Sequence, residues 1–395
     1  MTYLTSEDLR ISDTLPLLAP AALAAESPLD KAGADFVARS RHAVEDIFLG
    51  RDDRLLTVVG PCSIHDPAVA LDYANHLREA AARHAADLCV VMRVHVEKPR
   101  TIVGWKGLIN DPGLDGSFQI NHGLRLARKL MVDLAQLRVP VATEFLDTML
   151  GQYYSALVSW GLIGARTVES QMHRALASGL SMPVGFKNRT DGDVRVAVDA
   201  LLSARHAHWF ASLTRDGSPA MLGTSGNDRC QLVLRGGTHG PNYASASVQA
   251  AVELLQTAGL PPRLVVDCSH GNSGRDPERQ PAVAADLAAQ IAAGQRAISG
   301  VMLESNLVGG AQDYRARPLA YGRSITDPCL AWDKTLPVLA QLAAAIQKRR
   351  LRVGNPPRRA ANVADFPAPA MAASSHEEPH RLVPTGSWAA FSHRE

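Results

Sequence analysis

Short apolar runs alternate with longer amphipathic stretches along most of this chain. Eight runs rich in Val, Ile and Leu have the length and composition of strands that are buried on both faces. They cover residues 55–59, 88–94, 139–145, 162–167, 183–187, 231–235, 264–269 and 299–304. Strands of this kind that alternate with helices predict a parallel sheet with right-handed crossovers.

Stretches with apolar residues at helical spacing lie between most of these runs. The first places Phe36, Val44 and Ile47 on one side and ends before Gly50. The predicted helices cover 35–49, 68–85, 123–137, 152–159, 169–178, 193–207, 247–258, 283–293 and 336–349. Eight strand–helix units over roughly 300 residues fit a closed (β/α)8 barrel. An open doubly wound sheet is the alternative, and the lack of GxGxxG after the first strand weakens its nucleotide-binding form.

Three segments fall outside the repeat. Residues 1–34 are expected to form an extended arm, and residues 209–226 a hairpin inserted before the sixth barrel strand. Residues 351–395 combine Pro, Ala, Ser and Arg without periodicity, which predicts a disordered tail. The expected organisation is therefore an arm and helix over 1–50, a barrel over 51–350 and a tail over 351–395.

Composition narrows the class of protein. The 395 residues are 46% hydrophobic with a formal net charge of +2, which argues for a globular protein and against nucleic-acid binding. No apolar run approaches the roughly 18 residues that span a bilayer, and the polar, acidic N-terminus does not resemble a signal peptide. The five cysteines form no CxxC pair, which favours the reducing cytoplasm.

Basic side chains collect where the predicted strands end. One closes the second strand, two follow in its loop, and the fourth, fifth and sixth strands contribute one each. The set is Arg93, Lys98, Arg100, Arg166, Lys187 and Arg235. In a (β/α)8 barrel these positions face one mouth, where Arg forks suit phosphate and carboxylate oxygens. They predict a small, highly anionic ligand; the alternative is an ion network with Glu97, Glu144 and Asp267.

A mixed set of sulfur, nitrogen and oxygen side chains occupies the same predicted mouth. Cys62 follows the first strand, His270 the seventh and Glu304 the eighth, and Asp327 lies in the loop beyond. Such ligands can hold a divalent transition metal, with Mn, Fe, Co and Zn as candidates. Taken singly, each has an ordinary alternative, such as a buried apolar thiol or a hydrogen-bonded imidazole.

The motifs, in this order, resemble those of a known family. They include GPCSIHDP (60–67), MRVHVEKPRTIVGWKGLINDP (92–112), ATEFLD (142–147), GARTVESQMHRALASGLSMPVGFKN (164–188), GTSGNDRCQLVLRGG (223–237), DCSHGNS (267–273), GVMLESNL (300–307) and YGRSITDPCLAW (321–332). From about residue 3 to about residue 350 the chain resembles the class I, microbial short-chain 3-deoxy-D-arabino-heptulosonate-7-phosphate (DAHP) synthases.

That resemblance implies a cytoplasmic, metal-dependent transferase of the shikimate pathway, which leads to chorismate and the aromatic amino acids. The reaction condenses phosphoenolpyruvate with D-erythrose 4-phosphate and water, and gives DAHP and phosphate. The implied architecture is a (β/α)8 barrel with an N-terminal extension and an inserted hairpin, assembled into a homodimer or homotetramer.

The resemblance also assigns roles to residues of this chain. The metal ligands would be Cys62, His270, Glu304 and Asp327. The phosphoenolpyruvate site would comprise Arg93, Lys98, Arg166, Lys187 and Arg235, and the aldose phosphate site Arg100 and Thr101. Lys98 is the expected proton donor to the aldehyde oxygen. Glu144 is expected to orient the attacking water, and Asp327 completes the expected catalytic residues.

Feedback inhibition by an aromatic amino acid is a further implication, with phenylalanine favoured by Ser181. The acidic pair Glu7 and Asp8 of a neighbouring subunit would meet the ammonium group of the effector. The opposing wall would comprise Gln152, Leu176, Leu180, Ser181, Phe210 and Ser212. The alternative is that the acidic pair caps a short helix while the apolar side chains pack the hairpin onto the barrel.

Three single residues and one tripeptide depart from the family pattern. Arg189 stands where Gly is usual, Gly151 where Pro is usual, Cys268 where Phe is common, and His239-Gly240-Pro241 where Lys is frequent. If residue 189 required φ > 0, its side chain would strain the loop. None of the four removes a predicted ligand or substrate cation.

Two other functions remain open from the sequence. An enzyme that condenses phosphoenolpyruvate with another aldose phosphate, such as arabinose 5-phosphate, is disfavoured by the KPRT segment at 98–101. A catalytically silent paralogue that binds an effector or a partner subunit is disfavoured by the complete ligand set.

Overall fold

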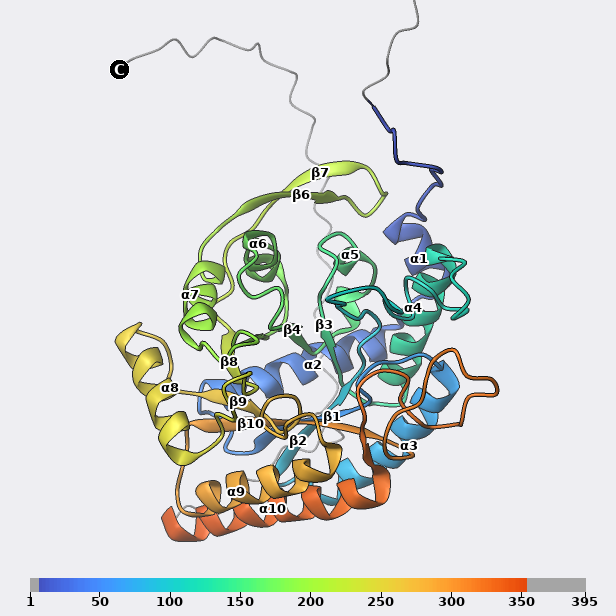
Figure 1. Ribbon diagram of the computed structural model, residues 1–395. Coiled ribbons are helices and arrows are strands. Elements are labelled where there is room, and N and C mark those ends of the chain that lie inside the picture. The colour runs from blue at the N-terminus through green and yellow to red at the C-terminus, as the bar shows by residue number, and fades with distance from the viewer. Residues whose placement is uncertain (1–6, 354–395) are drawn as a thin grey trace, which may run out of the picture. The chain divides into compact units, whose positions relative to one another are not determined.

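The computed structural model describes residues 7–353, which contain a closed barrel of eight parallel strands surrounded by helices (Figure 1). The barrel strands are β1 (Leu55–Gly60), β2 (Leu88–Arg93), β3 (Val141–Glu144), β4 (Trp160–Ile163), β5 (Val184–Lys187), β8 (Cys230–Leu234), β9 (Leu264–Asp267) and β10 (Ile298–Asn306). Each strand pairs in parallel with the next, and β1 pairs with β10 to close the ring. The (β/α)8 prediction is confirmed, and the open doubly wound alternative is wrong.

Helices follow the strands and encircle them in Figure 1. They are α3 (Pro67–Arg83), α4 (Ile120–Gln136), α5 (Gly151–Tyr154), α6 (Gln171–Gly179), α7 (Arg195–Ala204), α8 (Ser245–Thr257), α9 (Gln280–Ala292) and α10 (Trp332–Val353). The helix predicted at 152–159 is shorter than expected and continues as a 3-10 turn, Ser155–Leu157. The fourth strand begins earlier than predicted because Trp160 is buried and belongs to the barrel core.

An additional helix, α2 (Lys31–Phe48), closes the N-terminal end of the barrel. Its first turn is capped by the Asp30 carboxylate, which accepts from Gly33 N at 2.7 Å. Val44, Ile47 and Phe48 of α2 join one apolar cluster with the inward-facing side chains of the barrel strands. Apolar packing therefore fills this end of the barrel, and the polar side chains gather at the opposite end.

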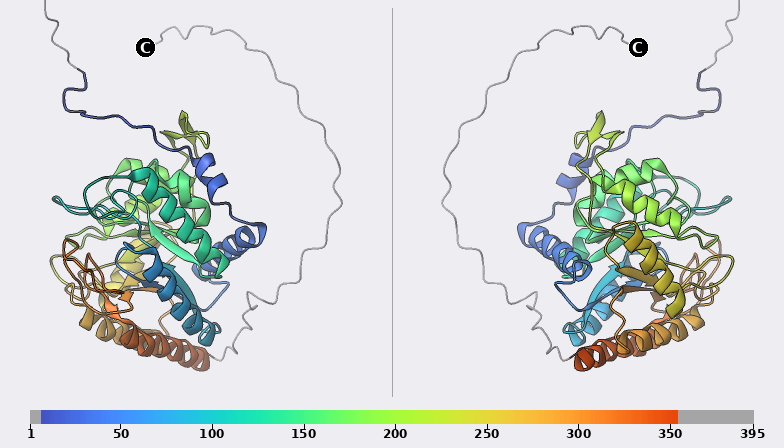
Figure 2. Two further views of the ribbon diagram at one scale, coloured as in Figure 1. Left: turned by 90° about the vertical axis from the view of Figure 1, so that its right-hand side faces the viewer. Right: turned by 90° about the vertical axis from the view of Figure 1, so that its left-hand side faces the viewer.

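The inserted hairpin consists of β6 (Trp209–Leu213) and β7 (Pro219–Gly223), which pair antiparallel as predicted. The arm was predicted to be extended over 1–34, which is wrong because α1 (Pro20–Glu26) forms with proline at its favoured first position. Ala21 N of α1 donates to Arg215 O in the hairpin turn at 2.7 Å, and both views of Figure 2 show the two segments together. The N-terminal helix and the hairpin are therefore in direct contact.

Two sequence predictions, the last helix and the tail, concern the C-terminal end of the described residues. The last helix continues to Val353, and the disordered tail predicted over 351–395 lies outside the described residues from 354 onward. No helix within residues 7–353 has the length and apolar character needed to cross a membrane. All five cysteines lie in the described part of the chain, and all five are free.

Candidate active site

Three of the four predicted metal ligands come together at the C-terminal end of the barrel. Cys62 follows β1, Glu304 lies in β10, and Asp327 belongs to the loop before the short strand β11 (Leu330–Ala331). Their ligand atoms all lie within 4.8 Å of one another, and Cys62 Sγ is 3.6 Å from Asp327 Oδ2. One sulfur and two carboxylates suit a divalent transition metal, whose charge would relieve their mutual repulsion.

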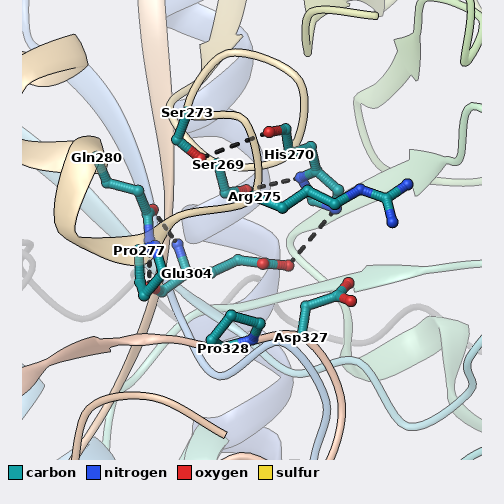
Figure 3. Close-up of a pocket in the computed structure, with 9 residues that line it drawn as sticks. All are labelled: Ser269, His270, Ser273, Arg275, Pro277, Gln280, Glu304, Asp327 and Pro328. Carbon is teal, nitrogen blue, oxygen red and sulfur yellow. Dashed lines mark hydrogen bonds and ion pairs between the residues drawn. The ribbon is translucent and has the colours of Figure 1, made fainter. Parts of the chain in front are cut away.

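His270 lies beside this group. Its Nε2 is 3.7 Å from Glu304 Oε1, and its Nδ1 is 2.7 Å from Ser269 Oγ (Figure 3). The same Nδ1 lies 2.9 Å from Asp267 Oδ2. The backbone of His270 adopts φ 56°, in the left-handed region. A carboxylate on one ring nitrogen fixes the imidazole and leaves the other nitrogen available to a metal.

The buried Lys98 lies among the acidic groups of the cluster, and these groups shift one another's pKa values. Lys98 Nζ lies 3.1 Å from Cys62 Sγ. Burial raises the pKa of the Cys62 thiol, and the Glu304 carboxylate adds to this shift. Burial disfavours the charge of Lys98, but Cys62 and Glu304 outweigh it and raise the pKa of Lys98. Burial likewise opposes the charge of Asp327, but Lys98 and His270 keep its pKa below the usual range.

A pocket that is open to solvent adjoins the cluster at the barrel mouth. Its lining includes the six predicted cations, Arg93, Lys98, Arg100, Arg166, Lys187 and Arg235, together with Asp327 and His270. The predicted Thr101 is exposed and does not line this pocket. The structure thus places the predicted cations and the ligand cluster around one space.

Some of these cations are paired and others are not. Arg93 Nη2 lies 2.8 Å from Glu304 Oε1, and Lys187 Nζ lies 2.8 Å from Asp267 Oδ2, so the ion-network alternative holds for both. Arg235 differs, because its Nε is buried and has no hydrogen-bond partner among the described residues. A buried guanidinium donor without a partner indicates that this wall suits an anion.

Glu144 lies on the same pocket wall, opposite a neutral imidazole. Its Oε2 is 3.5 Å from His95 Nδ1. Burial, reinforced by Arg93 and Lys98, holds the pKa of His95 well below the usual range, so His95 carries no charge at neutral pH. Gly164 approaches Glu144 so closely that a Cβ there would lie 2.0 Å from Oε1, which explains the glycine.

Sequence reasoning missed several residues at the mouth. Arg275 lines the pocket from the loop that also carries His270, and Thr190 lines it from the loop after β5. Asn188 accepts from Arg235 N at 2.7 Å and donates to Gly236 O at 3.0 Å, so it holds the backbone of the sixth barrel strand. Asn188 and Thr190 lie in the loop directly after β5, and Arg275 lies near the predicted ligand His270 in the sequence. These positions could have marked them as candidates.

Comparison with known proteins identifies the family. A model of the DAHP synthetase I family matches residues 30–340. The chain belongs to the DAHP synthetase I family. The match spans every strand of the barrel and both predicted sites at its mouth.

Relatives in this family are similar over most of the chain. The Phe-sensitive phospho-2-dehydro-3-deoxyheptonate aldolase of Escherichia coli K12 is 52% identical over 346 residues, 87% of this chain and 99% of that protein. The tyrosine-inhibited enzyme of Schizosaccharomyces pombe is 47% identical over 349 residues, 87% of this chain and 94% of that protein. The solved phospho-2-dehydro-3-deoxyheptonate aldolase of Francisella tularensis SCHU S4 superposes with a TM-score of 0.85 at 49% identity, covering 86% of this chain and 99% of that one.

The wall expected from other members of the DAHP synthetase I family is partly assembled. Leu176 of α6 and Phe210 of β6 are buried in the main core, and Ser212 Oγ is buried without a partner in the described chain. The full predicted wall is Gln152 on α5, Leu176, Leu180 and Ser181 at the end of α6, and Phe210 and Ser212 on β6. The alternative role for Leu176 and Phe210, packing the hairpin onto the barrel, is therefore also present.

The acidic pair lies in the arm. Glu7 and Asp8 are exposed, and Ile11 N donates to Asp8 O at 3.1 Å in a turn. Residues 7–19 contain no helix, so the alternative that these carboxylates cap one does not apply.

Three of the departures from the family pattern can be placed in the structure. Arg189 is not among the described residues with positive φ, and Gly192 takes the left-handed conformation in this loop instead. The Arg189 guanidinium is 38% exposed and lies 2.8 Å from Glu169 and 2.7 Å from Asp191, so the expected strain is absent. Gly151 begins α5 with Phe145 and Leu176 near its missing Cβ, and Cys268 is fully buried in the core.

Proposed function

We propose that this chain catalyses the aldol-type condensation of phosphoenolpyruvate with D-erythrose 4-phosphate and water to give DAHP and phosphate. The observation that carries the proposal is the shared pocket, in which six cations adjoin the Cys62, Glu304 and Asp327 cluster. Two phosphates and one carboxylate would account for that number of cations, since a single carboxylate would need far fewer.

Cys62, Glu304 and Asp327, with His270 beside them, would hold one divalent ion. The donor set fits Mn²⁺, Fe²⁺, Co²⁺ or Zn²⁺. Such an ion supplies Lewis-acid polarisation of the aldehyde carbonyl when it is bound. The protein contributes the remaining chemistry through its own side chains.

The phosphoenolpyruvate phosphate and carboxylate are assigned to the inner part of the pocket. Their partners would be Arg93, Lys98, Arg166, Lys187 and Arg235. The unpaired Arg235 Nε would gain an acceptor, and the ion pairs of Arg93 and Lys187 hold those cations in place beforehand. The aldose phosphate is assigned to Arg100 and Thr101, farther out along the loop.

The reaction forms a bond from C3 of phosphoenolpyruvate to the aldehyde carbon, after which water adds at C2 and phosphate leaves. Lys98 would donate the proton that the aldehyde oxygen requires, because its raised pKa keeps it charged among Cys62 and Glu304. Glu144 would orient the water, and the uncharged His95 lies 3.5 Å from its carboxylate. Holding both substrates in one pocket supplies much of the rate.

Control by an aromatic amino acid is the second part of the proposal. Relatives are named Phe-sensitive, Trp-sensitive and tyrosine-inhibited. In this chain phenylalanine is favoured, bound between the Leu176, Leu180 and Phe210 wall and the carboxylates of Glu7 and Asp8 from a second copy in a homodimer or homotetramer. The buried, unpaired Ser212 Oγ supports a polar ligand at this wall.

A product assay tests the proposed reaction. The full-length chain with Mn²⁺ should consume phosphoenolpyruvate and release phosphate in equal amounts only when erythrose 4-phosphate is added, with DAHP as the product. Arabinose 5-phosphate serves as the matched aldehyde control. Turnover with arabinose 5-phosphate and none with erythrose 4-phosphate would assign a different substrate. No turnover with either would overturn the proposal.

A further inference from the structure

Strand β10 extends beyond its neighbour at the barrel mouth. β9 ends at Asp267, whereas β10 continues to Asn306. The backbone hydrogen bond at the end of β9 runs from Cys268 N to Met302 O, at 2.8 Å. Because alternate residues of a strand direct their N–H and C=O to the same edge, the next pair on this edge belongs to Glu304. The chain after β9 turns into the His270 loop and supplies no strand there.

The side chain of Gln280 takes the place of the missing strand. Its Nε2 donates to Glu304 O at 2.9 Å, and its Oε1 accepts from Glu304 N at 2.9 Å (Figure 3). A primary amide has one donor and one acceptor, so it can satisfy the C=O and the N–H of one residue, which in a parallel ladder would bond two different peptide groups of the next strand. Gln280 is the first residue of α9 and only 1% exposed, so both hydrogen bonds are shielded from water.

The peptide held in this way carries a carboxylate that must point in one direction. Glu304 Oε1 accepts from Arg93 at 2.8 Å, and the carboxylate lies within 4.8 Å of the ligand atoms of Cys62 and Asp327. A small rotation of the Glu304 peptide would displace the carboxylate from the other two ligands, and metal binding depends strongly on ligand placement.

We propose that Gln280 is a positioning residue of the metal site, which fixes the Glu304 peptide so that its carboxylate meets Cys62 and Asp327. The inference rests on the metal-dependent function proposed above. Gln280 bonds the backbone of Glu304 rather than its carboxylate, and it does not line the pocket that holds the six cations. It lines a smaller pocket beside His270, Glu304 and Asp327 (Figure 3), and no motif in the sequence marks it.

Metal affinity of the full-length protein tests this role directly. Gln280→Met keeps the side-chain length and removes both hydrogen bonds, and it should weaken Mn²⁺ binding to the metal-stripped protein about tenfold or more, measured by competition with a chelator. Gln280→Glu keeps an acceptor for Glu304 N and should recover part of that affinity. Gln290→Met is the matched control, because Gln290 lies in the same helix and donates to Tyr243 O at 2.9 Å. It should bind Mn²⁺ like the unmodified chain.

A second measurement separates positioning from simple loss of stability. Saturating Mn²⁺ should raise the Tm of the unmodified chain, and this rise should be smaller in Gln280→Met. The Tm of Gln280→Met is also compared with that of the unmodified chain, both without metal and with saturating Mn²⁺. If the variant loses the same amount of Tm in both conditions, so that the metal-induced rise is unchanged, the role is structural and the inference is wrong. Wild-type affinity in Gln280→Met would also overturn it. If the unmodified chain binds no Mn²⁺, or if Cys62→Ala binds Mn²⁺ equally well, the proposed metal site itself is wrong.

Discussion

The barrel mouth and the wall beside the hairpin differ in how complete a site one chain provides. At the mouth, charged side chains are buried and contact one another: Arg93, 1% exposed, bonds Glu304, and Lys98 lies against Cys62. At the wall, Leu176 and Phe210 are buried in the core, whereas Ser181 is exposed. The carboxylates assigned to this second site lie in the arm.

The difference follows from how the two regions are built. Parallel strands of one barrel deliver their C-terminal ends to the same face, so the charged residues converge within a single chain. The wall joins a helix end to an inserted hairpin, and the carboxylates that the proposal assigns to it belong to the separate arm. Changes at the mouth should therefore abolish the reaction, while changes at the wall should alter only its control.

The largest expected effect comes from Lys98. Lys98→Met removes the proposed proton donor and should lower kcat about 10²–10⁴-fold, since general acid catalysis typically contributes that much. Lys106→Met is the control, because Lys106 is exposed in the same loop, and Lys98 N donates to its carbonyl rather than its side chain. Steady-state kinetics with both substrates measures the effect. A Lys98→Met enzyme within tenfold of the unmodified kcat would remove Lys98 from the proton transfer.

Removing residues 1–12 should separate the two regions. The shortened chain should lose inhibition by phenylalanine and keep most of its uninhibited rate, because the proposal assigns the carboxylates of Glu7 and Asp8 to the effector site alone. Coupling between such sites is typically about 1–3 kcal/mol. Phosphoenolpyruvate should weaken phenylalanine binding by the same factor by which phenylalanine weakens phosphoenolpyruvate binding.

A chain without residues 354–395 is the matched truncation. It should keep its inhibition by phenylalanine and a kcat/KM within a few-fold of the full-length value. The reason is that the composition of the removed residues does not favour a packed core. Titration of the full-length enzyme with Phe, Tyr and Trp in turn provides the direct measurement. No inhibition by any of them at millimolar concentration would reject the effector site.

A buried hydrogen bond connects the two regions and should make stability depend on pH. Tyr154 Oη donates to Glu97 Oε2 at 2.9 Å, which joins the residue before Lys98 to the helix that carries Gln152. Burial raises the pKa of Glu97 to about 8, above the value of about 4.3 in an unfolded chain. Between these values the folded chain keeps a proton that the unfolded chain has lost. The free energy of unfolding therefore falls as pH rises and levels off above about 8.

Glu97→Gln cannot ionise and still accepts the Tyr154 hydrogen bond. Its free energy of unfolding should fall less between pH 5 and pH 8 than that of the unmodified chain, by about 3.5 kcal/mol. Denaturant unfolding at several pH values measures the difference, with Glu253→Gln, an exposed carboxylate, as the control. Parallel pH profiles for Glu97→Gln and the unmodified chain would show that Glu97 is ionised throughout.

The smallest effect is expected at Arg189. Its two ion pairs are partly exposed, and such pairs contribute little to stability. Arg189→Ala should leave the free energy of unfolding nearly unchanged, because exposed ion pairs contribute little, and leave kcat/KM within about twofold. Denaturant unfolding and kinetics check both values. A large loss of activity would mean that this departure from the family pattern takes part in the reaction.

Periodicity and strand ends predicted most of the fold and the general position of the site. Eight apolar runs gave eight barrel strands, and the six cations at their ends line one pocket. Helix α1 was missed because its seven alanine-rich residues, Pro20–Glu26, resemble the surrounding arm, and contact with the hairpin turn helps to hold them. Helix propensity depends on neighbouring residues in the sequence and therefore could not predict this contact with a distant segment.

Residues that act through another residue could not be predicted. Gln280 has no chemical signature in the sequence, since its importance depends on β10 extending past β9. Arg275 lay outside the pattern because it follows His270 in a loop rather than closing a strand. Pairing of Lys187 with Asp267, and of Arg93 with Glu304, likewise depends on distances that sequence spacing does not give.

The central claim is that one metal-dependent active site is assembled at the barrel mouth from Cys62, Glu304 and Asp327. The most direct measurement compares the metal content and DAHP-forming activity of the unmodified chain and Cys62→Ala. After treatment with EDTA the unmodified chain should be inactive, and about one equivalent of Mn²⁺ per chain should restore its activity. Cys62→Ala should bind little metal and stay inactive at the same Mn²⁺ concentration. Full activity of either protein in the presence of EDTA would contradict the account.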